Sequence, residues 1–332
     1  MRRYVIRRII VSILILLLVA LLIYTILRCI PSSYVENMAR ERATQPGSKS
    51  YAEWLAQLNA VYGLDSGIIE GFFRWLGAAL RGDFGDSWYY NVPVAEKFTE
   101  VIWYSFVLAA LGFILVLLIA VPLGVTAARH QYSWRDNVLT VLALIGISLP
   151  AFFFATLLKW LFAVKLQWLP LFGAVGRYYQ QLSGWQQFWD LAAHFVLPVA
   201  TLVIVSVGGL MRFTRVNMLE VLDSDYIRAA RAKGLPESRV ISRHAFRNTL
   251  LPLVTIAGAS LPTLFAGALI IETLFQIPGI GWTAYQAMVA GDIPFSMFYL
   301  LFIAVLTLLG ALLADICYAL ADPRVRVGGG EG

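Results

Sequence analysis

Long apolar runs, separated by shorter polar stretches, dominate the chain. A helix needs about 20 predominantly apolar residues to cross the hydrocarbon core of a bilayer, and six runs approach or exceed that length. They are residues 9–27, 101–128, 137–164, 191–211, 250–275 and 297–320. The pattern predicts an all-α polytopic membrane protein with six transmembrane helices.

Two of the runs contain a proline that bears on the shape of the span. Pro122, followed by Gly124, is expected to break the second run near its end, and Pro150 lies near the middle of the third. Proline removes a backbone N–H and its ring clashes with the preceding turn, so each position predicts a break or a kink.

The charges outside the runs predict an orientation. Four arginines, Arg2, Arg3, Arg7 and Arg8, precede the first run, whereas residues 31–100 carry six basic and nine acidic side chains. Cytoplasmic segments of membrane proteins are enriched in Lys and Arg, so both termini are expected in the cytoplasm and residues 31–100 outside. The first run is longer than the apolar core of a signal peptide, about 7–15 residues, and is expected to stay as a span.

The expected organisation follows from these boundaries. Residues 1–30 form a cytoplasmic N-terminus and the first transmembrane helix, and residues 31–100 form an extracytoplasmic segment. Residues 101–320 form a five-helix core that contains a cytoplasmic loop at 212–250, and residues 321–332 are a cytoplasmic tail.

The extracytoplasmic segment has local patterns of its own. Residues 51–62 and 68–80 have apolar and polar positions at helical spacing, which predicts two short amphipathic helices. The second contains Phe72 and Trp75 and is suited to the membrane interface. Residues 82–85, Gly-Asp-Phe-Gly, predict a turn.

Composition excludes an ordinary soluble domain. Hydrophobic residues make up 59% and charged residues 14% of the 332 residues, and soluble domains are nearer a quarter charged. The mean hydropathy is +0.72. The net charge of +6 is concentrated in a few segments, and no basic groove with interleaved aromatic residues predicts a nucleic-acid partner.

The most polar interruption of the C-terminal two-thirds is residues 212–250, called here the basic segment. Between Arg212 and Asn248 it carries eight Arg or Lys residues against four Asp or Glu. Asp225 is expected to cap a helix that Gly234 ends, because glycine readily adopts the left-handed conformation found there.

A second helix is expected to begin near Pro236 and to continue through Thr249. Its arginines at 239, 243 and 247 fall four residues apart and form one basic stripe, and Ile241 and Ala245 form another face. Such a segment between two spans either contacts lipid headgroups or docks a cytoplasmic partner.

Catalytic and metal-binding motifs are absent from the sequence. It contains no Walker A sequence, no H-E-x-x-H, no Cys-x-x-Cys and no G-x-S-x-G, and its three histidines are far apart. We therefore expect neither an enzyme active site nor a metal site.

Three ionisable residues, Lys159, Glu272 and Asp315, lie inside predicted spans, where charges are costly and often functional. Glu272 and Lys159 are the candidates for a translocation path. Glu272 has the alternative of a structural hydrogen bond. Lys159 has the alternative of extending its amine towards the membrane surface.

The basic segment resembles the EAA loop of ABC importer permease subunits, the element that docks on the ATPase. The family pattern is Glu-Ala-Ala, three residues, then Gly; here residues 228–234 read Arg-Ala-Ala-Arg-Ala-Lys-Gly, with Arg in place of Glu. The order of further pieces is similar to the B-type permease of the dipeptide/oligopeptide/nickel branch. These pieces are residues 82–85 with 93–94, 119–124, 148–152, 168–170, 243–248, 271–275 with 278–281, and 318–324.

This resemblance implies an ABC type I importer permease fold in a prokaryotic plasma (inner) membrane, crossed several times. The implied partners are a second homologous permease subunit, two cytoplasmic ABC ATPases, an extracytoplasmic solute-binding protein, a peptide substrate and membrane lipid. ATP and Mg²⁺ would bind to the ATPases, so no cofactor is expected on this chain. The implied ATPase-coupling residues are Asp225, Tyr226, Arg228, Ala229, Ala230, Lys233, Gly234, Leu235, Arg243, His244 and Asn248.

Other functions remain open from the sequence. A nickel complex or glutathione could replace the peptide as substrate, since similar permeases carry them. A secondary carrier or channel that works without ATPases, with a basic segment that binds anionic lipid, is the alternative from another class. A membrane-embedded enzyme is the third, and the chain offers no convergent catalytic set for it.

Overall fold

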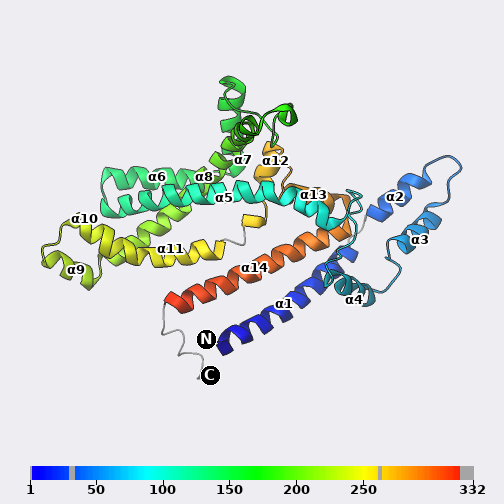
Figure 1. Ribbon diagram of the computed structural model, residues 1–332, viewed down its shortest axis with the longest axis horizontal. Helices are drawn as coiled ribbons and strands as arrows, with labels where there is room; N and C mark the ends of the chain where they lie inside the picture. Colours follow the sequence, from blue (N-terminus) through cyan, green and yellow to red (C-terminus); the bar gives the residue numbers. More distant parts are fainter. Residues whose placement is uncertain (1, 30–33, 261–263, 322–332) are drawn as a thin grey trace. The chain divides into compact units, whose positions relative to one another are not determined.

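The computed structural model describes residues 2–29, 34–260 and 264–321, and these residues are mostly helical (Figure 1). Within these ranges the β pairing is limited to an isolated antiparallel bridge between Asp86 and Pro93. The prediction of an all-α chain is confirmed.

The chain divides into two compact units. The first consists of residues 1–103 and 279–309, and the second of residues 104–278 and 310–332. The predicted tail after residue 321 lies outside the described residues.

The first unit is built from helices and their connecting turns. They are α1 (Arg2–Cys29), α2 (Tyr34–Ala43), α3 (Tyr51–Val61), α4 (Ile68–Ala79), the start of α5 (Val94–Arg129), α13 (Ile280–Ala290) and most of α14 (Ile293–Ala321). The two predicted amphipathic helices are confirmed as α3 and α4. Ser50 begins α3 with a reciprocal cap, in which its backbone N–H donates to Glu53 at 2.8 Å.

The second unit contains the rest of α5 and α14 and the elements between them. These are α6 (Trp134–Ser148), α7 (Ala151–Leu158), the π-helix η1 (Lys159–Lys165), the 3₁₀-helix η2 (Tyr179–Gln181), α8 (Gly184–Leu222), α9 (Asp225–Ala232), α10 (Glu237–Arg239), the π-helix η3 (Val240–Ala245), α11 (Phe246–Ser260) and α12 (Leu269–Phe275).

The two prolines have opposite effects on their helices. The expected break at Pro122 is wrong, because α5 continues through it to Arg129. The lost N–H is tolerated there, and the Pro122 carbonyl accepts a hydrogen bond from the Thr126 hydroxyl at 2.7 Å. At Pro150 the chain does break: α6 ends at Ser148, α7 begins at Ala151, and the two helices are bent by 100°.

Several predicted boundaries shift in the structure. The prediction of one helix over residues 250–275 is wrong, because α11 ends at Ser260 and α12 begins at Leu269, with Gly267 left-handed at φ +83° before it. The stretch 276–296, between the fifth and sixth predicted spans, contains α13.

The number of spans is only partly decided by these helices. Within the described ranges, four helices are long and apolar enough to cross a membrane, or five if the bent pair α6 and α7 counts as one span. The sixth span and the orientation of the termini stay predictions.

Glycines allow α5, α6 and α8 to pack closely in the second unit, where the three helices lie side by side (Figure 1). A Cβ at Gly124 would lie 2.6 Å from the Met211 carbonyl oxygen, and a Cβ at Gly208 would overlap the Ala143 carbonyl oxygen. Without these side chains the helix backbones approach one another more closely than larger residues allow. The base of the basic segment is therefore held in a tight three-helix contact.

Candidate functional site

The basic segment begins inside helix α8. This helix continues to Leu222, well past the predicted end of the fourth span at residue 211. Ser224 follows in an extended conformation and is the N-cap of α9, so the prediction that Asp225 is the cap is wrong. Asp225 is instead the first helical residue, and its exposed carboxyl oxygen lies 3.4 Å from Arg228. An acidic residue in the first turn is favourable to the helix dipole.

The second half of the segment is helical throughout but not uniformly α-helical. Pro236 precedes α10, the π-helix η3 follows, and α11 continues the same path. The predicted second helix is confirmed in position, with a π-helical stretch within it. The arginines at 239, 243 and 247 are all exposed, and Ile241 and Ala245 are buried, as the spacing predicts.

An apolar core holds the basic segment together. The buried side chains of Ile227 and Ala230 from α9 meet Val240, Ile241 and Ala245 from η3. The remaining members of this cluster are Met218 and Leu222 from α8 and Ala128 from the end of α5. Burial of this apolar surface stabilises the segment as a folded unit on α8 rather than as a loose loop.

The turn between α9 and α10 is closed by backbone conformation and by an ion pair. Gly234 is left-handed at φ +75°, as predicted, and a Cβ built on it would meet no atom within 4 Å. Arg231 on one side of the turn donates to Glu237 on the other, with Nη2 to Oε1 at 2.9 Å. This hydrogen bond lowers the pKa of Glu237 and raises that of Arg231.

A second polar contact joins α9 to the start of α11. The side-chain amide of Asn248 donates to the hydroxyl of Tyr226 at 2.8 Å and to the carbonyl of His244 at 3.2 Å. Tyr226, His244 and Asn248 are all predicted coupling residues, and the fold brings them together.

Ten of the eleven predicted coupling residues are exposed or partly buried, and Ala230 is the exception. Ala230 is 7% exposed and belongs to the core. The chain leaves most of the others open to solvent, with Leu235 and His244 partly buried. The exposed ones are Asp225, Tyr226, Arg228, Ala229, Lys233, Gly234, Arg243 and Asn248. The face combines arginines, one lysine and small residues, which suits it to a partner that offers acidic or carbonyl groups and approaches closely.

Of the two candidate path residues, Glu272 is part of helix α12 and Lys159 contacts that helix. Glu272 is fully buried in the second unit, where its Oε1 accepts the hydroxyl of Ser105 at 2.6 Å and the backbone N–H of Ala268 at 2.9 Å. The amine of Lys159 donates to the carbonyl of Leu274 at 2.7 Å and lies 5.3 Å from the centroid of the Phe275 ring. These contacts tie α12 to α5 and η1, and whether either residue faces a path stays a prediction.

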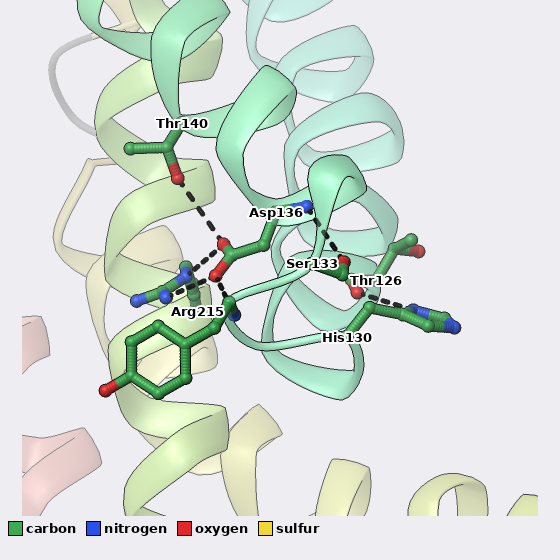
Figure 2. A network of polar contacts seen from close by, with 7 residues as sticks. Thr126, His130, Ser133, Asp136, Thr140 and Arg215 are labelled. Carbon is green, nitrogen blue, oxygen red and sulfur yellow. Dashed lines mark hydrogen bonds and ion pairs between the residues drawn. The ribbon is translucent and has the colours of Figure 1, made fainter.

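An ion pair between a partly buried arginine and a buried carboxyl group joins α6 to α8 (Figure 2), and sequence reasoning missed it. Arg215 binds Asp136 through both ends of its guanidinium, with Nε to Oδ1 and Nη2 to Oδ2 each at 2.7 Å. The Asp136 side chain is 3% exposed. An Asp three residues after Ser133 is a helix-start signal, but no local pattern indicates that its partner lies on α8.

The first unit contains another buried carboxyl group that the sequence did not reveal. Asp292 is fully buried and accepts hydrogen bonds from the hydroxyl of Ser87 and from the backbone N–H groups of Tyr89 and Phe295. Nearby, the hydroxyl of Tyr90 donates to the Thr283 carbonyl at 2.9 Å, and burial raises the pKa of Tyr90. These contacts tie the stretch after the Gly-Asp-Phe-Gly turn to the start of α14.

The comparison with known families decides the family of the chain. Residues 120–327 match the family described as "Binding-protein-dependent transport system inner membrane component". Residues 1–93 match "Binding-prot-dependent transport system membrane comp, N-term". The chain belongs to this family of inner-membrane transport components.

Known relatives of this inner-membrane component match it over most of its length. The oligopeptide transport system permease protein AppB of Bacillus subtilis is 35% identical over 327 residues, which cover 98% of this chain and 100% of the relative. The dipeptide transport system permease protein DppB of Escherichia coli K12 is 34% identical over 98% of this chain and 99% of the relative. A putative peptide transport system permease protein of Brucella abortus is 36% identical over 84% of this chain and 87% of the relative.

Membership confirms the family predicted from residues 228–234 and from the ordered pieces along the rest of the chain. In this inner-membrane component the basic segment, Glu272 and Lys159 all lie in the matched range 120–327. Among the residues that the structure describes, no group of three or more His, Cys, Asp or Glu side chains is placed to hold a metal ion.

Proposed function

We propose that this chain is the transmembrane permease subunit of an ATP-driven ABC importer for di- and oligopeptides. An extracytoplasmic solute-binding protein delivers the peptide, and a second homologous permease subunit completes the path. Two cytoplasmic ATPases bind ATP and Mg²⁺ and drive the cycle through the basic segment. The named activities of the oligopeptide and dipeptide relatives support the substrate class.

The single observation that carries this proposal is the form of the basic segment. It is a folded unit with its own apolar core, and its outer face leaves Arg228, Ala229 and Lys233 exposed. A segment that merely bound anionic lipid would need positive charge but neither a separate core nor a turn closed by Gly234. A rigid docking surface needs both, because force from a partner must reach the spans without unfolding the contact.

The proposed topology follows from the charges. The chain crosses the membrane six times with both termini in the cytoplasm, α11 and α12 together contributing to the fifth crossing. The arginines of residues 2–8 and of the basic segment then share the cytoplasmic side, and the acidic segment 31–100 lies outside.

Co-purification followed by reconstitution tests the proposal. The affinity-tagged chain is isolated from its native membrane, and the complex is placed in liposomes with ATP and Mg²⁺ inside and the binding protein and a labelled dipeptide or tetrapeptide outside, the lumen representing the cytoplasm. We expect two ATPases and a second permease subunit to co-purify, and uptake to require ATP.

The alternatives give different results in the same system. Uptake by this chain alone, driven by an ion gradient and indifferent to ATP, would establish a secondary carrier and reject the proposal. ATP-dependent uptake of a nickel complex or glutathione, without uptake of peptide, would keep the importer and change the substrate.

A further inference from the structure

The α5–α6 turn is fastened to the last part of α8, which is also the beginning of the basic segment. Arg215 lies on α8 ten residues before α9 begins, and Asp136 lies in the first turn of α6. The two are 79 residues apart in sequence, and two parallel hydrogen bonds of 2.7 Å join them. Such a forked contact fixes the angle between its two partners as well as their distance.

Asp136 is held in place by more than its arginine (Figure 2). The backbone N–H of Tyr132 donates to Oδ2 at 3.0 Å, the hydroxyl of Thr140 donates to Oδ1 at 3.4 Å, and the hydroxyl of Ser133 accepts from the Asp136 N–H at 3.4 Å. Tyr132 adopts a left-handed conformation at φ +63°, which is uncommon for a residue with a side chain. The turn is therefore built around the carboxyl group of Asp136.

The neighbouring turn residues add a further contact on the same hairpin. The Nδ1 of His130 donates to the Thr126 carbonyl at 3.0 Å, which continues the end of α5 into the turn (Figure 2). The hairpin from α5 to α6 is thus internally hydrogen-bonded, and Arg215 is its polar link to α8.

The same hairpin also contacts the basic segment directly. Ala128 at the end of α5 belongs to the apolar cluster that contains Ile227 and Ala230 of α9. One turn back, Gly124 allows α5 to lie against Met211 and Thr214 of α8. Apolar contacts of this kind bring surfaces together but permit sliding, whereas a bidentate ion pair has one geometry.

We propose that Asp136 and Arg215 are a positioning pair that makes the α5–α6 hairpin and the basic segment move as one body. The inference rests on the proposed function. Displacement of the basic segment by an ATPase would otherwise be absorbed as bending or rotation of α8. With the pair in place, the same displacement carries α5 and α6 with it. In this proposal both residues act through the helices that they join.

Uptake and ATP hydrolysis, measured on the same liposomes and normalised to the amount of assembled complex, test the proposal. Asp136→Asn removes the ionic acceptor with little change in shape. We expect ATP hydrolysis to persist and the peptide taken up per ATP to fall by about fivefold or more, since coupling between sites is typically of this size. Arg215→Lys keeps the charge but loses the fork, and should give a smaller fall in the same ratio.

Two further variants separate positioning from mere stability. Glu70→Gln breaks an exposed ion pair with Arg74 whose N–O distance, 2.8 Å, is similar. It should leave the peptide taken up per ATP unchanged. Asp136→Leu combined with Arg215→Met replaces the buried pair by apolar groups. This exchange often preserves folding, so the double variant should assemble and still show the low ratio.

The outcomes distinguish the two proposals. If Asp136→Asn takes up as much peptide per ATP as the wild type, the positioning role is overturned and the importer proposal stands. The same holds if uptake and hydrolysis fall in parallel. A wild-type ratio in the assembled double variant overturns it as well. If the wild-type complex takes up neither peptide nor the alternative substrates with ATP, the proposed function fails and this inference fails with it.

Discussion

Ala229 and Ala230 are adjacent in α9 and have opposite surroundings: Ala229 is exposed, and Ala230 is 7% exposed within the core of the basic segment. The motif pattern treats the two as one unit. In the structure, Ala230 packs against the segment itself, and Ala229 is the one open to a partner. Of the two, Ala230 contributes to the folding of the segment, and Ala229 is available for the proposed docking.

Substitution by leucine should give different defects at these two positions. Ala230→Leu overfills the core and should destabilise the segment by about 1–3 kcal/mol, with increased hydrogen exchange across α9 and η3. Ala229→Leu should leave exchange unchanged and weaken retention of the ATPases during purification. Identical exchange profiles in the two variants would contradict the assignment.

Gly234 should tolerate substitution according to backbone conformation rather than size. A Cβ there has open space, so the cost comes from φ +75° alone, about 1–2 kcal/mol for a residue such as Ala. Asn adopts this conformation more readily and should support more uptake than Ala, whereas β-branched Val should support the least. Uptake rates should therefore decrease from Asn to Ala to Val. If Ala instead supports more uptake than Asn, side-chain volume decides the result, and position 234 makes a steric contact with the ATPase.

The Arg231–Glu237 pair should make the turn sensitive to acid. The folded-state pKa of Glu237 is lowered, so its contribution to stability is complete above the unfolded value near 4.5 and is lost as pH falls through the lower folded value. Because both side chains are 43–47% exposed, the effect is expected to stay at about 0.2–1 kcal/mol.

Hydrogen exchange of the turn amides, compared between wild type and Glu237→Gln, measures that contribution. The two proteins should differ above about pH 5 and converge on acidification. A difference that grows as the pH falls would have the wrong sign and would reject the pair as its source.

Glu272 should behave as a structural acceptor in the second unit. Glu272→Ala removes the partner of the Ser105 hydroxyl and of the Ala268 N–H, and should cost about 1–3 kcal/mol of stability. Glu272→Gln keeps an acceptor oxygen and should lose less. Thermal unfolding of the detergent-solubilised complex measures both.

The path role that the sequence predicts for Glu272 would give another pattern. Uptake would fall in Glu272→Gln while the unfolding temperature stayed at the wild-type value, because a residue that lines a path acts through charge rather than packing. The same two measurements on Lys159→Met provide a comparison, because the amine of Lys159 donates to the Leu274 carbonyl of the same helix.

Local chemistry explains how much of the basic segment the sequence reveals. Gly234 predicts a left-handed turn, because other residues are sterically disfavoured in that conformation. The spacing of Ile241 and Ala245 predicts a buried face. The sequence predicts the cap one residue too late, because Ser224 and Asp225 both favour a helix start and only the backbone shows which one precedes the helix. Pro122 shows the same limit, since a long helix with apolar neighbours tolerates a proline that a propensity scale would reject.

The runs of apolar residues and the turn chemistry of Gly234 are enough to predict a helical membrane protein with a folded basic segment, because each of these signals acts over a few neighbouring residues. The resemblance of residues 228–234 and of the ordered pieces along the chain, rather than these signals, indicates the family. The pairing of Asp136 with Arg215, the burial of Glu272 against Ser105 and the division of labour between Ala229 and Ala230 were visible only in the folded chain. These three features depend on which helices pack against one another. The packing is set by contacts between surfaces that are far apart in sequence rather than by local preference.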